Sequence, residues 1–94
     1  MDVVKVPGII KNHKVFVYAL STCAWCKKTK KFFQDKSIEF EYVDVDRCSE
    51  EDLEKIKKEI TKRGCSMSFP LIIVDGKTNI TGFREDKIQE ALQL

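Results

Sequence analysis

Two cysteines separated by two residues, Cys23 and Cys26, lie where a strand-like run meets a helix-like run, and this junction restricts the fold more than any other feature. The preceding run, residues 15–20, is continuously apolar and rich in β-branched and aromatic side chains, which is typical of a strand covered on both faces. From Cys26 to about Lys36, apolar residues recur at helical spacing. A Cys-x-x-Cys pair at a strand-to-helix junction predicts a thiol-disulfide redox site.

The segments after the cysteine pair continue an alternating strand and helix pattern. Residues 38–43 alternate apolar and acidic side chains, which predicts a strand with one solvated face. Because a helix connects it to residues 15–20, the two strands are expected to be parallel. Residues 49–52 resemble a capping box, and apolar residues at spacings of three and four then predict a second helix that ends at Gly64.

The last part of the chain predicts a hairpin and a final helix. Residues 71–74 and 78–81 are strand-like segments on either side of an Asp-Gly turn, and residues 85–92 carry an inward-facing apolar stripe. A chain of 94 residues with 43% hydrophobic side chains has enough apolar residues for one core. Residues 1–94 are therefore expected to form a single α/β domain.

The first 13 residues show little periodicity and are expected to be a loosely packed lead-in. Val3, Val4 and Ile9 are its candidates for contact with the domain. His13 is given no functional role, because the chain has no second histidine with which it could share a metal or a proton relay.

The formal charge of +2 is unevenly distributed along the chain. Residues 1–36 hold eight lysines against two aspartates, whereas acids are in excess in residues 37–94. The sequence has no arginine-rich segment and no basic segment with interspersed aromatic residues, which are typical of nucleic-acid binding. An acidic protein partner is therefore favoured. The sequence shows no apolar run of membrane-spanning length and no signal peptide, so a cytoplasmic protein without membrane association is expected. A monomer is expected as well.

The two cysteines are predicted to have different roles. Disulfide exchange begins with attack by a thiolate, and a free cysteine, with a pKa of ~8.5, is mostly protonated at neutral pH. Cys23 is expected in the first turn of the helix, where unpaired N–H groups and the helix dipole favour an anion. Ser21 and Thr22 would supply the N-cap, and Lys27 adds positive charge. Cys23 is therefore predicted to attack a substrate disulfide, and Cys26, one turn later, to resolve the mixed disulfide.

A metal site is the main alternative for this cysteine pair. Zinc needs four ligands, and the remaining candidates, Cys48, Cys65 and His13, form no second close pair, so neither metal nor cofactor is expected. An iron-sulfur cluster shared between two chains through Cys23 stays open.

Cys48 and Cys65 flank the second predicted helix, which at about 15 residues is ~22 Å long. A disulfide needs Cα atoms about 4.4 to 6.8 Å apart, so the two are not expected to bridge. We interpret them as a loop thiol and a partly buried small apolar residue, with a regulatory redox role as the alternative.

Three motifs together resemble the glutaredoxin family, and the resemblance covers nearly the whole chain from Lys14 onward. In chain order they are Cys23-Ala24-Trp25-Cys26, Phe69-Pro70 and Thr81-Gly82-Phe83. The resemblance implies a thioredoxin-type fold, βαβ then ββα, with three helices and a four-stranded mixed sheet in the order 2-1-3-4. It also implies that Pro70 is cis and packs beside the dithiol, and that the backbone of Phe69 pairs with an extended substrate segment.

The chain departs from the glutaredoxins that use glutathione. Those proteins usually have Pro-Tyr between the cysteines, a Lys or Arg three residues before the first, and a Gly-Gly followed shortly by Asp. Here Ala24-Trp25, Leu20 and Gly82-Phe83 stand at these positions. Loss of one charge-assisted contact typically weakens binding by roughly 1.5 to 3 kcal/mol, so a donor other than glutathione is favoured. A glutathione-dependent glutaredoxin remains the alternative.

Residues 82–86 resemble the Ser-Gly-Phe-Arg-Pro-Asp segment of the NrdH-type redoxins. Two positions depart from that family: Glu85 replaces the proline, and Leu20 stands where those proteins also usually have a Lys or Arg. Those glutaredoxin-like proteins take electrons from a thioredoxin-reductase-type enzyme and reduce ribonucleotide reductase. The resemblance implies a dithiol-disulfide oxidoreductase whose partners are a disulfide-containing protein and a reductase. Phe83 could instead cap the core, whereas an exposed Trp25 would contact a partner. The expected substrate-binding residues are Thr22, Trp25, Lys27, Phe69, Pro70, Gly82 and Phe83.

Overall fold

Strand β2 (Val15–Ala19) lies at the centre of a five-stranded sheet in the order β1-β3-β2-β4-β5. In the computed structural model, which describes residues 1–94, β2 is parallel to β3 (Phe40–Asp44) and antiparallel to β4 (Leu71–Val74). Strand β5 (Thr78–Thr81) pairs with β4 as the second arm of the hairpin. The predicted order of these four strands and their one parallel pair are therefore confirmed.

The N-terminal segment is not the loose lead-in that its sequence suggests. Residues Val4–Val6 form a fifth strand, β1, antiparallel to β3, so the predicted four-stranded sheet was one strand short. Ile10 continues the attachment, because its N–H donates to the Ser37 carbonyl and its own carbonyl accepts from Glu39 N–H. A strand of three residues is too short to show an alternating pattern, which is why the sequence concealed it.

The contacts of this segment also differ from those expected. Val6 and Ile10 pack against the core, whereas Val3, Val4 and Ile9 are exposed. Gly8 passes so close to the backbone of residues 37–39 that an added Cβ would lie 2.5 Å from the Glu39 nitrogen. Only glycine fits at this crossing.

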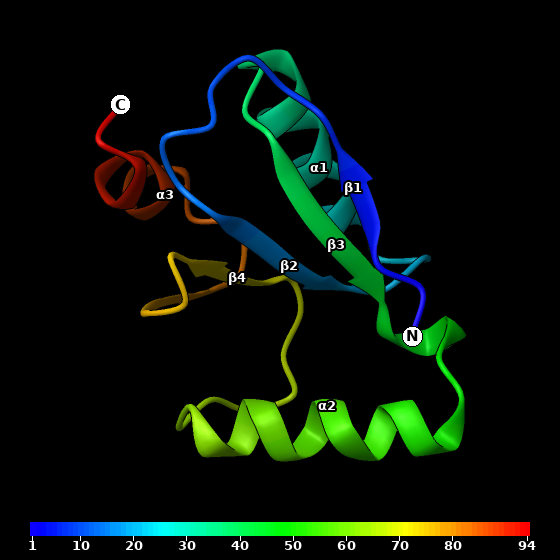
Figure 1. The fold of residues 1–94 in the computed structure, drawn as a ribbon. Coiled ribbons are helices and arrows are strands. Elements are labelled where there is room, and N and C mark those ends of the chain that lie inside the picture. Colours follow the sequence, from blue (N-terminus) through cyan, green and yellow to red (C-terminus); the bar gives the residue numbers. More distant parts are fainter.

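Three helices cover the two faces of the sheet (Figure 1). Helices α1 (Ala24–Asp35) and α3 (Glu85–Leu92) pack on one face, where their buried residues join Val15, Val17 and Ala19 of β2. Helix α2 (Glu50–Lys62) packs on the other face, against Tyr18 of the same strand. Because successive side chains of a strand point to opposite faces, the continuously apolar run serves two cores.

The limits of α2 and α3 agree closely with the sequence. Ser49 caps α2 by accepting a hydrogen bond from Asp52 N–H at 3.2 Å, and Gly64 follows the helix with φ of +74°. A short 3-10 turn, η1 (Val45–Arg47), joins β3 to α2 and was not predicted. None of the helices combines the length and apolar character that a membrane span requires.

Candidate active site

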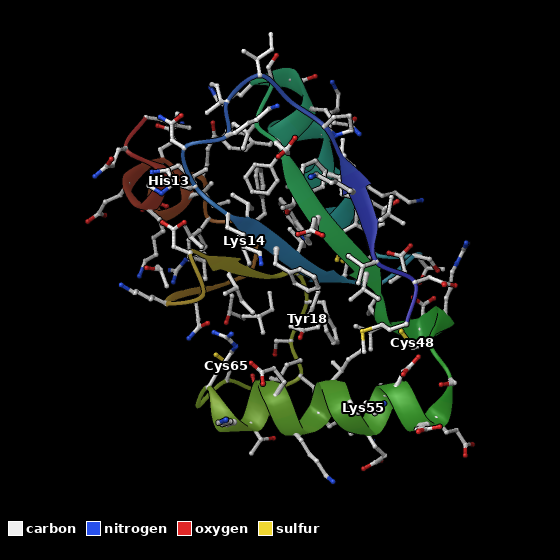
Figure 2. All side chains as sticks on the ribbon, in the orientation of Figure 1. His13, Lys14, Tyr18, Cys48, Lys55 and Cys65 are labelled. Carbon is white, nitrogen blue, oxygen red and sulfur yellow. The ribbon has the colours of Figure 1, made fainter.

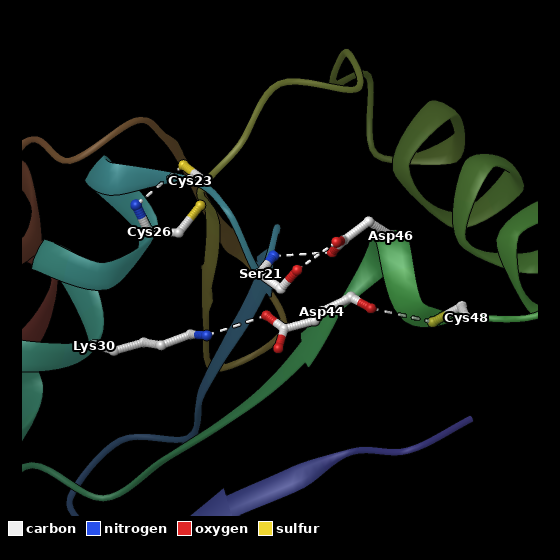
Figure 3. Close-up of polar contacts among 7 residues, drawn as sticks. All are labelled: Ser21, Cys23, Cys26, Lys30, Asp44, Asp46 and Cys48. Atoms are coloured by element: carbon white, nitrogen blue, oxygen red, sulfur yellow. Dashed lines mark hydrogen bonds and ion pairs between the residues drawn. The ribbon is translucent and has the colours of Figure 1, made fainter.

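Cys23 is itself the N-cap residue of α1, and its Sγ accepts a hydrogen bond from the backbone N–H of Cys26 at 3.1 Å (Figure 3). The helix begins at Ala24, two residues earlier than its apolar pattern indicated. The prediction that Ser21 and Thr22 would cap the helix is therefore wrong. The cap position places the Cys23 sulfur at the positive end of the helix dipole, in contact with one of the unpaired N–H groups.

Ser21 instead fixes the loop that leads to Cys23. Its backbone N–H donates to Asp46 Oδ1 at 2.8 Å, and its hydroxyl donates to the other carboxylate oxygen (Figure 3). The Ser21 hydroxyl and N–H hold the pKa of Asp46 below its usual range. Asp46 lies in η1, so this contact ties the loop before the dithiol to the segment that follows β3.

This contact predicts a dependence of stability on pH. Because the folded-state pKa of Asp46 is lowered, the contact stabilises the fold fully at pH values above the unfolded-state pKa of ~3.9. This stabilisation is lost as the pH falls through the folded-state pKa. An Asp46→Asn variant should therefore be less stable than the parent at neutral pH, and the difference should narrow below about pH 4. Urea midpoints between neutral and acid pH test this. Ser21→Ala and the double variant complete a cycle, and additive losses would contradict a direct contact.

Cys26 is completely buried behind Cys23, which is only partly buried. Burial raises the pKa of the Cys26 thiol to about 12, and the hydrogen bond and charge of Cys23 act in the same direction. A hydrogen bond with the Leu20 backbone and the positive charge of Lys30 act in the opposite direction. Because Cys26 is buried and Cys23 is only partly buried, Cys23 is the thiol that a large substrate can reach.

Seven residues line a cavity of about 340 Å³, and one of them is Trp25, which lies between the two cysteines in the chain. They are Trp25, Phe69, Pro70, Thr81, Gly82, Phe83 and Arg84. The structure thus brings together five of the seven predicted substrate-binding residues, while Thr22 and Lys27 are exposed outside this lining. Thr81 and Arg84 were absent from the predicted set, although both adjoin the Gly-Phe motif that was recognised.

Two aromatic residues form the rim of this cavity. The Trp25 side chain is 57% exposed, and its ring centroid is 6.3 Å from that of Phe83. Phe83 also lies 5.7 Å from Phe32 in an edge-to-face arrangement and packs against the core. The two interpretations of Phe83 are therefore compatible, since its side chain both packs against the core and lines the cavity.

The backbone of Phe69 is available for pairing. No hydrogen bond within the protein uses its N–H or its carbonyl, whereas the neighbouring Pro70 carbonyl accepts from Gly82 N–H at 2.8 Å. The Phe69–Pro70 bond is cis. A main-chain donor and acceptor at the edge of a cavity are what an extended peptide needs to add a short strand.

The other candidate residues lie away from this site. Cys48 and Cys65 are free thiols at opposite ends of α2 (Figure 2). Burial raises the pKa of the Cys48 thiol, which donates to the Asp44 carbonyl at 3.6 Å. His13 Nδ1 is 2.7 Å from Asp75 Oδ2, so it joins the N-terminal segment to the hairpin turn. No group of three or more His, Cys, Asp or Glu side chains is arranged to hold a metal ion.

A βαβ-ββα fold with a Cys-x-x-Cys pair at the N-terminus of its first helix defines a dithiol protein of the thioredoxin fold. Comparisons with known proteins show which family of this class the chain resembles. The Glutaredoxin family model matches residues 15–78. The chain is 32% identical over 77 residues, 82% of its length, to a glutaredoxin-like 8.6 kDa protein in the rubredoxin operon of Clostridium pasteurianum, and the match covers 95% of that protein.

Two solved structures are similar over almost the whole chain. The glutaredoxin from Methanosarcina mazei Go1 is 40% identical with a TM-score of 0.87, covering 98% of this chain and 88% of that one. Methanoredoxin from Methanosarcina acetivorans is 44% identical with a TM-score of 0.84, covering 93% and 90%. The chain belongs to the glutaredoxin family, and like its relatives it is a thiol-disulfide oxidoreductase.

Proposed function

We propose that this protein reduces disulfides in other proteins by a two-cysteine route. Cys23 attacks the substrate disulfide and forms a mixed disulfide, and Cys26 then attacks Cys23 and releases the reduced substrate. The observation that carries the proposal is the position of the two sulfurs. Cys23 Sγ accepts the Cys26 N–H at the helix N-terminus, whereas the Cys26 side chain is completely buried behind it.

The substrate is an extended segment of a protein that lies across the cavity. The unpaired N–H and carbonyl of Phe69 support main-chain pairing beside Cys23, and the exposed Trp25 ring offers an apolar contact. Lys28 Nζ lies 4.5 Å from the centre of the Trp25 ring, and Lys27 is exposed beside it. The positive charges of these two lysines favour a partner that has acidic residues near its disulfide.

The electron donor is a thioredoxin-reductase-type flavoenzyme rather than glutathione. Leu20, at the position where a cation would hold the glycyl carboxylate of glutathione, packs against the apolar cluster under α2. Phe83 fills the place of the second glycine and lines the cavity. The likeness of residues 82–86 to the NrdH-type segment supports the same donor, and it extends the proposal to ribonucleotide reductase as the target.

A comparison of donors tests this proposal. Insulin reduction is followed with catalytic amounts of the protein, once with glutathione and glutathione reductase and once with NADPH and a thioredoxin-reductase-type flavoenzyme. We expect turnover with the flavoenzyme at least about tenfold faster, because a missing charge-assisted contact costs roughly 1.5 to 3 kcal/mol. Leu20→Lys should raise the rate in the glutathione assay and leave the rate with the flavoenzyme unchanged. Equal or faster turnover of the unsubstituted protein with glutathione would overturn the choice of donor.

A further inference from the structure

A largely buried ion pair joins α1 to β3, one helical turn along α1 from Cys26. Lys30 follows Cys26 by one helical turn on α1, and its Nζ is 3.1 Å from Asp44 Oδ1 at the end of β3 (Figure 3). The side chains of Lys30 and Asp44 are only 19% and 17% exposed. Lys30 Nζ also lies 3.9 Å from the centre of the Tyr42 ring. These contacts hold the ammonium group in one place.

The surroundings of the Cys26 thiol contain few other charges. Strands β2 and β4 and helix α3 contribute apolar side chains to the core cluster that includes Cys26. Cys23 and Lys30 on α1 are the ionisable groups whose charges act on it, and they act in opposite directions. Asp44 and Tyr42 of β3 affect Cys26 indirectly, because they hold the Lys30 ammonium group in position.

The balance between these two charges changes during the proposed reaction. In the free dithiol, a negative charge on Cys23 opposes ionisation of Cys26. In the mixed disulfide, Cys23 is uncharged, so that opposition disappears while the positive charge of Lys30 remains. Lys30 therefore acts at the stage when Cys26 must become a thiolate.

We propose that Lys30, held by Asp44 and Tyr42, is a positioning residue for the resolving step and favours the Cys26 thiolate within the mixed disulfide. This role rests on the proposed two-cysteine route. The Cys26 thiol loses its proton, its sulfur bonds to Cys23 Sγ, and the bond between Cys23 and the substrate sulfur breaks. The electron pair of that bond leaves with the substrate sulfur, which takes up a proton. The substrate cysteine is reduced, and Cys23 and Cys26 are oxidised to a disulfide.

The test separates the two chemical steps. The reduced protein is mixed with a peptide whose single cysteine carries a thionitrobenzoate group, and release of thionitrobenzoate reports the attack by Cys23. Acid quenching and intact mass then follow the decay of the peptide mixed disulfide. In Lys30→Met and Lys30→Gln we expect this decay to be about three- to tenfold slower at neutral pH, with its pH profile displaced to higher pH. The first step should be unchanged, and Lys30→Arg should retain most of the rate.

Lys31→Met is the matched control. It makes the same substitution on the same helix, but Lys31 pairs with Asp35 in solvent, with side chains 74% and 62% exposed. It should alter neither step. Equal losses in Lys30→Met and Lys31→Met, or slower decay without a displaced pH profile, would overturn the role of Lys30. Decay of the mixed disulfide in Cys26→Ser as fast as in the parent would instead overturn the two-cysteine route, and the role of Lys30 with it.

Discussion

A Cys23→Ser variant is expected to lose disulfide reductase activity by about three orders of magnitude or more, because a serine hydroxyl cannot form the mixed disulfide. The fold should be unaffected, since the Cys23 side chain is a partly buried N-cap and serine is among the best capping residues. Insulin reduction with the preferred donor measures the loss. A Cys23→Ser protein that still reduced insulin would refute the assignment of the nucleophile.

The companion variant, Cys26→Ser, should behave differently. It keeps the backbone N–H that donates to Cys23 Sγ, so the first attack should proceed, and the product should be trapped as a stable mixed disulfide. Intact mass of the quenched protein would show one substrate chain bound per molecule. Cys48→Ser and Cys65→Ser are the controls, because both thiols lie at the ends of α2 away from the cavity lining and should neither trap substrate nor lose activity.

The largest effect on stability is expected from Phe33→Ala. Phe33 lies on α1, is completely buried, and has its ring centroid 5.2 Å from Phe40 and 5.8 Å from Phe32. Removing a buried phenylalanine ring typically costs about 3 to 5 kcal/mol, against a total stability of about 5 to 15 kcal/mol for a small domain. Urea denaturation should show a midpoint far below that of the parent, because Phe33 anchors the helix that carries both active cysteines.

Trp25→Ala is the natural control for this variant. Trp25 is an aromatic residue on the same helix, but its side chain is 57% exposed, so its loss should cost less than about 1 kcal/mol. The same variant should raise the KM for a protein disulfide, because the proposed substrate contact is lost. A loss of stability equal to that of Phe33→Ala would show that the Trp25 and Phe83 pair belongs to the core rather than to a binding rim.

Most of the secondary structure could be predicted because its signals are local. The β4 and β5 limits and those of α3 agree with the sequence patterns, since turn residues stand on both sides of each strand and Gly82 precedes the helix. Strand β1 could not be predicted, because three residues carry no measurable period and pairing with β3 alone makes them a strand. The start of α1 was misplaced because cysteine is not among the residues normally favoured as N-caps.

The charged side chains around the site were the least predictable part. On a helix with five lysine, glutamine or aspartate side chains exposed to solvent, Lys30 could not be distinguished from its solvated neighbours by sequence alone. The only signal was its spacing of four from Cys26, combined with Asp44 at the end of the strand parallel to β2. Likewise, Asp46 became visible as a partner for Ser21 only when η1 was in place.

The sequence by itself determined the dithiol and the strand-helix-strand unit around it, because spacing and periodicity are properties of neighbouring residues. The order of the four main strands was implied by the resemblance to the glutaredoxin family. The sequence also predicted different roles for the two thiols, but only the tertiary structure decided their surroundings. It makes Cys23 the helix cap, buries Cys26 behind it, and pairs Lys30, one helical turn after Cys26, with Asp44 of β3. Burial and charge depend on residues distant in the chain, so the different environments of two nearby cysteines arise only when the sheet and helices meet.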